Sequence, residues 1–139
     1  MKLALEDSRR MVLRFDEGEE VLEGIKNFMQ QRGLSACVFY GIGACSLAEL
    51  AYFDLADKIY KKTVLKQNLE IASLIGNGGR KDGQAFVHAH AVLGDKDLKT
   101  YGGHAARLVV SATCEIFLIT LNGQLNREID PTLSLSLLI

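Results

Sequence analysis

The sequence predicts a single α+β domain over residues 1–139, mainly β-sheet with one main helix. Only one segment repeats its apolar residues at helical spacing. Elsewhere, strand-like segments follow one another without intervening helices, which disfavours a doubly wound parallel sheet. A length of 139 residues suits one domain, and 48% hydrophobic with 24% charged residues argues against disorder.

Charge and cysteine content limit the functional classes. The formal net charge is −1, and neither half of the chain has the excess of basic residues expected of a dedicated nucleic-acid binder. No segment resembles a signal peptide or reaches the ~20 apolar residues of a membrane span. The three cysteines lack C-x-x-C spacing and lie in apolar runs. We therefore expect buried free thiols in a cytoplasmic protein without a membrane partner.

The N-terminal part predicts a strand followed by the helix. Residues 10–15 alternate enough for an opening strand, and Asp16 with Glu19 is close to a capping box. Gly33 is well placed to end the helix. The apolar face of the helix repeats at the expected spacing: Val21, Leu22, Ile25, Phe28 and Met29.

The next third of the chain predicts further strands. Residues 35–53 hold two of them, and residues 60–66 predict an exposed or edge strand after a polar turn. Gly41-Ile42-Gly43 lacks the third glycine and the following helix of a dinucleotide loop, so that interpretation is disfavoured.

Residues 70–76 predict a buried strand that leads into a glycine-rich loop at Gly76–Gly83. Arg80 and Lys81 in this loop could contact an anion. A plain surface loop is the simpler interpretation.

All three histidines of the chain lie in two short pieces. Residues 85–93 predict a strand, which places His88 and His90 on one face, roughly 6.6 Å apart along the backbone. A hairpin centred on Lys96 would place His104 opposite His88 on that face. A shift of half a residue would move His104 to the other face.

Three imidazoles on one surface are a common donor set for a divalent metal, with zinc preferred and copper, iron or nickel as alternatives. Three protein ligands leave a position open for water, as in catalytic zinc sites. The alternative is that His88, His90 and His104 are polar strand residues that lie close together without a function. Because all three histidines share a plausible face, the metal interpretation is favoured.

Residues 108–121 are almost continuously apolar, which predicts a strand covered on both faces. One helix cannot cover both sides of such a sheet, so we expect part of the cover to come from another subunit of an oligomer. The tail at 133–137 alternates and predicts a last strand with one buried face.

Glu70 and Glu115 are carboxylates in apolar sequence, and either could support the metal ligands or act as an acid/base group. The competing interpretation pairs either glutamate with Arg107 or with a backbone donor. No catalytic residue is assigned from the sequence.

Several blocks of the sequence resemble the PPC (plants and prokaryotes conserved) domain, in the free-standing prokaryotic form. The blocks occur in the family's order: Arg14–Glu19, Gly41–Ala44, Tyr52–Asp54, Glu70–Asn77, His88-Ala89-His90 and Gly102-Gly103-His104. The resemblance implies an α+β fold with an antiparallel sheet, a homotrimer, and a histidine cluster at His88, His90 and His104 that takes a divalent metal.

Two functional hypotheses follow from the resemblance and the residues. The first is a small trimeric metal-binding protein, with a small molecule as a possible ligand and an activity that the sequence does not specify. The second is a DNA-associated or protein-interaction regulatory module. The AT-hook of the plant proteins is absent, and the one proline is Pro131, so direct DNA binding is expected to be weak or absent.

Overall fold

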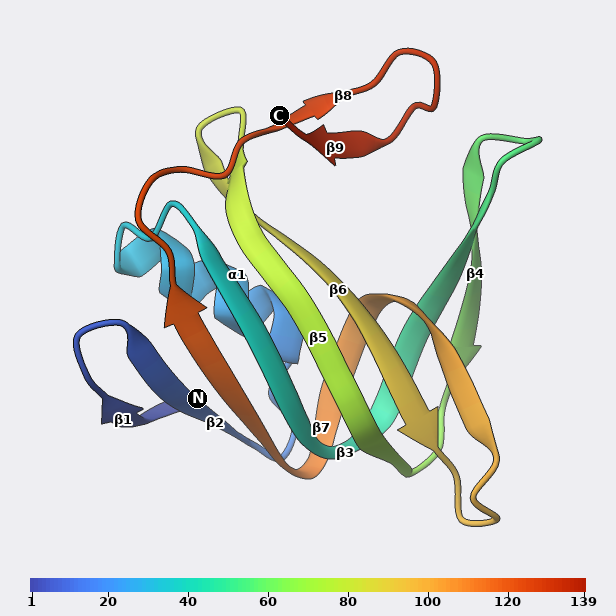
Figure 1. The fold of residues 1–139 in the computed structure, drawn as a ribbon. Helices are drawn as coiled ribbons and strands as arrows, with labels where there is room; N and C mark the ends of the chain where they lie inside the picture. Colours follow the sequence, from blue (N-terminus) through green and yellow to red (C-terminus); the bar gives the residue numbers. More distant parts are fainter.

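The computed structural model describes residues 1–139 and contains a seven-stranded antiparallel sheet, one α-helix and a separate two-stranded sheet (Figure 1). The elements are β1 (Lys2–Glu6), β2 (Arg10–Asp16), α1 (Val21–Gln31), β3 (Cys37–Asp54), β4 (Ile59–Leu65), β5 (Leu69–Lys81), β6 (Gln84–Gly94), β7 (Thr100–Thr120), β8 (Arg127–Ile129) and β9 (Ser136–Leu138). The large sheet has the order β1-β2-β7-β6-β5-β3-β4. The predicted fold, mostly antiparallel sheet with a single helix, is confirmed.

The sheet curls because β3 and β7 are long enough to pair with each other as well as with their neighbours. Four strands therefore close into a ring, in which β7 pairs with β6, β6 with β5, β5 with β3, and β3 with β7. The sequence predicted two strands in residues 35–53, but β3 is one continuous strand of 18 residues. The predicted strand at 60–66 is confirmed as the edge strand β4.

The helix α1 is positioned by acidic side chains at its N-terminus. The Glu20 carboxylate accepts from the backbone N–H groups of Leu22 and Glu23, and Oε1 also accepts from Leu108 N at 2.9 Å, which ties the helix to β7. Asp16 N donates to Glu19 Oε2 at 2.8 Å. Gly33 has a φ of +65° after the last turn, as the sequence predicted. No helix of the chain is both long and apolar enough to cross a membrane.

The core lies between α1 and one face of the sheet. The helix buries Val21, Leu22, Ile25, Phe28 and Met29, the residues that the sequence predicted. Strand alternation sends the other side chains to the opposite surface, which we call the outward face. Exposed apolar residues of the outward face are Val38, Tyr40, Ile42, Ile75, Val92 and Phe117.

Two predictions about irregular segments are wrong. Residues 76–81 are not a loop but the second half of β5, where the glycines allow close approach: a Cβ at Gly78 would collide with the buried Met29 side chain, and one at Gly79 with the Leu125 carbonyl. The tail at 133–137 is only partly strand. Asp130 Oδ1 accepts from Thr132 N and Leu133 N at 2.9 and 2.7 Å, which holds a turn, and β9 begins only at Ser136.

Candidate metal centre

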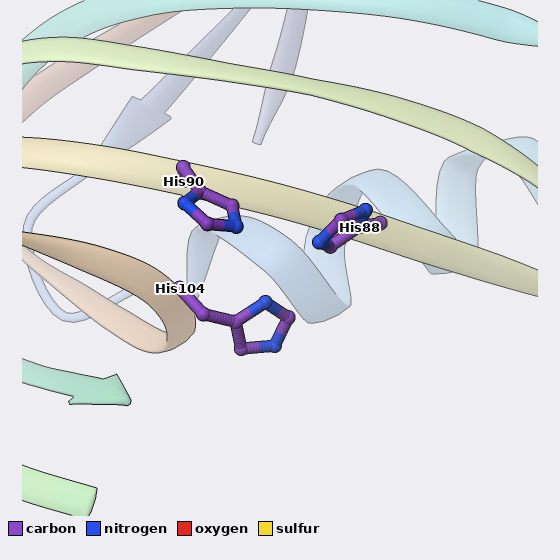
Figure 2. Close-up of side chains that lie close together, drawn as sticks. All are labelled: His88, His90 and His104. Atoms are coloured by element: carbon purple, nitrogen blue, oxygen red, sulfur yellow. The ribbon is translucent and has the colours of Figure 1, made fainter. Parts of the chain in front are cut away.

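The three histidines converge on the outward face from two adjacent strands. His88 and His90 come from β6 and His104 from β7, and their rings point into a common space (Figure 2). The ring centroids are separated by 5.3 Å for His88–His90, 5.1 Å for His88–His104 and 5.5 Å for His90–His104. One nitrogen of each ring lies within 4.8 Å of one nitrogen of the others. Rotations of the side chains can therefore direct all three lone pairs at one ion.

The register of the hairpin differs from the one that the sequence favoured. His104 lies opposite His90, not His88. The hairpin is centred on Asp97, one residue later than predicted, and Asp95 closes its turn: Asp95 Oδ1 accepts from Asp97 N and Lys99 N at 2.9 and 3.0 Å. The partner of His104 on β6 is therefore two residues from the predicted one. A shift of two residues keeps a side chain on the same face of the sheet, so His104 stays beside His88 and His90.

The partly buried imidazoles of His88 and His104 are neutral near pH 7. Burial lowers the pKa of His88 to about 4, with smaller contributions from the nearby His104, Arg127 and His90. Burial also lowers the pKa of His104, and His90 acts in the same direction. A neutral imidazole has a free lone pair, which is the form that binds a metal. The donor set therefore fits a divalent ion, and the Nδ1 of His104 is buried without a hydrogen-bond partner.

An arginine from the C-terminal hairpin reaches the histidines. Arg127 begins β8, and its guanidinium donates to Ser136 O and to Asn77 Oδ1, both at 2.8 Å. Its Nη2 also lies 3.4 Å from His88 Nδ1. Because a guanidinium can only donate, this contact needs a lone pair on that nitrogen. A proton or a metal ion on His88 Nδ1 would displace Arg127 from it.

A cavity of about 510 Å³ opens beside the histidines. Its polar lining groups come from six strands and the turn before β9: Tyr60, Asn77, Lys81, His88, His104, Arg127, Ser134 and Ser136. Apolar side chains, including Phe86 and Ile129, complete the wall, and none of the lining residues is acidic. The cavity is therefore cationic with apolar walls.

The other residues that the sequence singled out lie in different places. Lys81 lines the cavity with His88 and His104, whereas Arg80 donates to Gln30 Oε1 at 2.9 Å on the helix side. Neither Glu70 nor Glu115 lines that cavity; both are exposed and line another one.

The register explains why the structure does not bring these glutamates to the histidines. Glu70 pairs with Gly94, four residues or about 13 Å along β6 from His90. Glu115 pairs with Ile42 and Arg14, in the half of β7 remote from His104. Neither forms an ion pair within the chain, so the alternative pairing with Arg107 is not observed.

The sequence reasoning missed Arg127, Ser136 and Asn77. One signal for Arg127 was present, since it is the only basic residue after Arg107. Its approach to His88 was not predictable, because the two residues are 39 positions apart and belong to different sheets.

One family of known proteins matches this chain. The family model described as the Plants and Prokaryotes Conserved (PCC) domain matches residues 3–122. No curated protein matches the chain.

Three solved structures are similar over nearly the whole chain. A metal-containing protein from Archaeoglobus fulgidus is 35% identical, with a TM-score of 0.89, 100% of this chain covered and 99% of that one. A plant- and prokaryote-conserved (PPC) protein from Pyrococcus horikoshii is 35% identical, with a TM-score of 0.88 and 100% and 97% covered. A candidate DNA-binding protein from Bacteroides thetaiotaomicron is 21% identical, with a TM-score of 0.93 and 97% and 94% covered, and this likeness concerns the fold alone.

Proposed function

Because this chain belongs to the plants and prokaryotes conserved (PCC) domain family, we propose that it is a metal-binding member of that family. The ion is divalent, with zinc preferred, and the ligands are His88, His90 and His104. The observation that carries the proposal is the convergence of three imidazoles within 4.8 Å on one face of the sheet. The name of the 35% identical Archaeoglobus fulgidus protein, which describes it as metal-containing, supports it.

The bound metal would act as a Lewis acid on a water molecule or a ligand oxygen at the open position. The chain's own residues would prepare that position. Burial keeps His88 and His104 neutral, and Asn77 with Ser136 fixes the guanidinium of Arg127 beside His88. The Tyr60 ring packs against His104 with 4.8 Å between centroids, which restricts the imidazole.

The metal proposal is tested by elemental analysis of protein purified without a histidine tag. We expect about one zinc ion per chain, and about none in a His88→Ala variant that keeps its fold. Val92→Ala is the matched control, since Val92 is an exposed residue of the same strand and the same face. Full metal content in the His88→Ala variant, or an unfolded metal-free protein, would contradict the assignment.

We further propose that the protein is a homotrimer, because its outward face is too apolar to remain uncovered. Tyr40 and Phe117 stack there with 5.4 Å between ring centroids, and Tyr40 and Ile42 are 51% and 56% exposed. A cyclic assembly can bury such a face without leaving a new one.

Light scattering tests the assembly. We expect three chains at micromolar concentration, and a smaller mass for Ile42→Lys. Leu98→Lys is the control, because Leu98 is also exposed but lies in the β6–β7 turn. A stable monomer for the unmodified chain would refute the trimer.

The apolar outward face also favours a second candidate function, an interaction module that binds another protein. A triple His→Ala variant separates the two functions, because an interaction module would keep its activity without metal. We propose that direct DNA binding is weak or absent, in keeping with the net charge of −1. A cytoplasmic location suits the three buried free cysteines.

A further inference from the structure

Arg127 is a buried cation without a counter-charge. Its residue surface is only 6% exposed, and none of the ion pairs of the chain includes it. Its guanidinium lies over the Phe86 ring, with 5.2 Å to the centroid. Lys81 approaches the same ring at 5.9 Å, so a second cation lies close by. Burying a charge without a partner is unfavourable, which points to an anion that completes this cavity.

Three buried polar atoms without hydrogen-bond partners belong to residues that line this one cavity. They are His104 Nδ1, Arg127 Nε and Ser136 Oγ, and they are all the buried unpaired side-chain nitrogen and oxygen atoms of the chain. Buried polar atoms are nearly always paired in folded proteins. A water molecule could satisfy Ser136, but it would not neutralise Arg127. A ligand with anionic oxygens satisfies both requirements.

We propose that this cavity binds a small organic carboxylate, with Arg127 as the residue that holds the anionic group. A neighbouring oxygen of the same molecule would occupy the open position on the metal, so the inference rests on the proposed metal site. Three N–H groups of the guanidinium have partners in Ser136, Asn77 and His88. Of the five, Nε–H and one N–H of Nη1 remain, and Nε–H can donate to a carboxylate oxygen of the ligand.

The apolar walls favour an organic anion over a bare inorganic one. Phe86, Ile129 and Leu137 line the cavity, and its volume of about 510 Å³ lies in the range of small-molecule sites.

The C-terminal hairpin supplies the anion-binding residues Arg127 and Ser136. Arg127 and Ser136 lie beyond residue 122, where the match to the family model ends. The hairpin forms a separate two-stranded sheet beside the end of β5 and its connection to β6 (Figure 1). The histidines lie within the residues that the family model matches, and the groups that would hold the anionic end of the ligand lie after them in the chain.

The test uses the full chain loaded with Co²⁺, whose visible spectrum reports a ligand on the metal. Lactate is the probe, because it has a carboxylate next to a hydroxyl group. Unmodified protein and the control Lys96→Met, changed in the exposed β6–β7 turn, should show the same saturable spectral change. Arg127→Met should weaken lactate binding about tenfold or more, and Ser136→Ala about threefold, with equal cobalt per chain.

The outcomes separate the inference from the proposed function. Absence of bound cobalt overturns the metal site and the inference together. If the cobalt content is normal, two results overturn the inference and leave the metal site standing. Either lactate leaves the spectrum unchanged, or both variants bind lactate as tightly as the unmodified chain. Tighter binding of inorganic phosphate than of lactate overturns the carboxylate assignment. If Arg127→Met does not fold, Ser136→Ala decides, because removal of an unpaired hydroxyl leaves every observed hydrogen bond intact.

Discussion

Gly76→Ala should disturb the candidate metal centre without touching a histidine side chain. Gly76 lies on β5 opposite Ala89 and beside Phe39 of β3. A Cβ at this position would collide with the carbonyl oxygen of His88 and with the Phe39 ring, whose Cε2 would lie only 2.9 Å away. The φ of Gly76 is not positive, so the predicted effect is steric and not conformational.

Neither neighbour of that Cβ can yield easily. Phe39 is 1% exposed and is held in the core, and the His88 oxygen belongs to the backbone of the β5–β6 ladder. Forcing a methyl group into such a position costs about 3 kcal/mol, the upper end of typical overpacking. Since the free energy of unfolding falls by ~2 kcal/mol per molar urea, the urea concentration at the unfolding midpoint should fall by roughly 1.5 M. Movement of β6 at His88 should also weaken zinc binding about tenfold.

Gly94→Ala is the matched control, because Gly94 lies on the neighbouring strand and its Cβ would meet nothing within 4 Å. We expect this variant to differ from the unmodified chain by less than about 0.5 kcal/mol. Urea unfolding and zinc affinity should be measured for both variants. Equal stability and equal zinc affinity of Gly76→Ala and Gly94→Ala would refute the close contact between β3, β5 and β6.

Two further predictions concern titratable groups. The metal-free protein should lose stability as the pH falls from about 6.5 to about 4. The pKa of His88 is about 4 in the folded chain and has its ordinary value of 6.5 in the unfolded chain. The unfolded chain therefore takes up the proton first, which favours unfolding. The loss in the free energy of unfolding should be about 1–2 kcal/mol after allowance for solvent screening. Urea midpoints measured at pH 6.5 and pH 4 should show a smaller loss for His88→Asn than for the unmodified chain. Burial raises the pKa of Cys37 and Cys45 to about 11 and of Cys114 to about 12, so a thiol reagent near pH 8 should label none of them in the folded protein and all three in denaturant. Rapid labelling of the native chain would contradict their burial.

The sequence by itself determined the features that depend on local periodicity. Helical spacing located α1 and its buried face, and alternation placed His88 and His90 on one side of β6. Both inferences need only neighbours along the chain, because the backbone geometry of a helix or a strand fixes where each side chain points. Alternation also explains why Glu115 is exposed although its neighbours Cys114 and Ile116 are buried.

Only the tertiary structure decided which distant residues meet. The partner of His104 depends on a turn in which one aspartate side chain binds two backbone N–H groups, and such a turn can shift the register while keeping the face. Arg127 reaches His88, 39 positions away in the sequence, because the C-terminal hairpin lies beside the β5–β6 connection. Periodicity contains no information about such contacts between distant residues. Their geometry is set by packing between helices and strands and not by the sequence pattern within one of them.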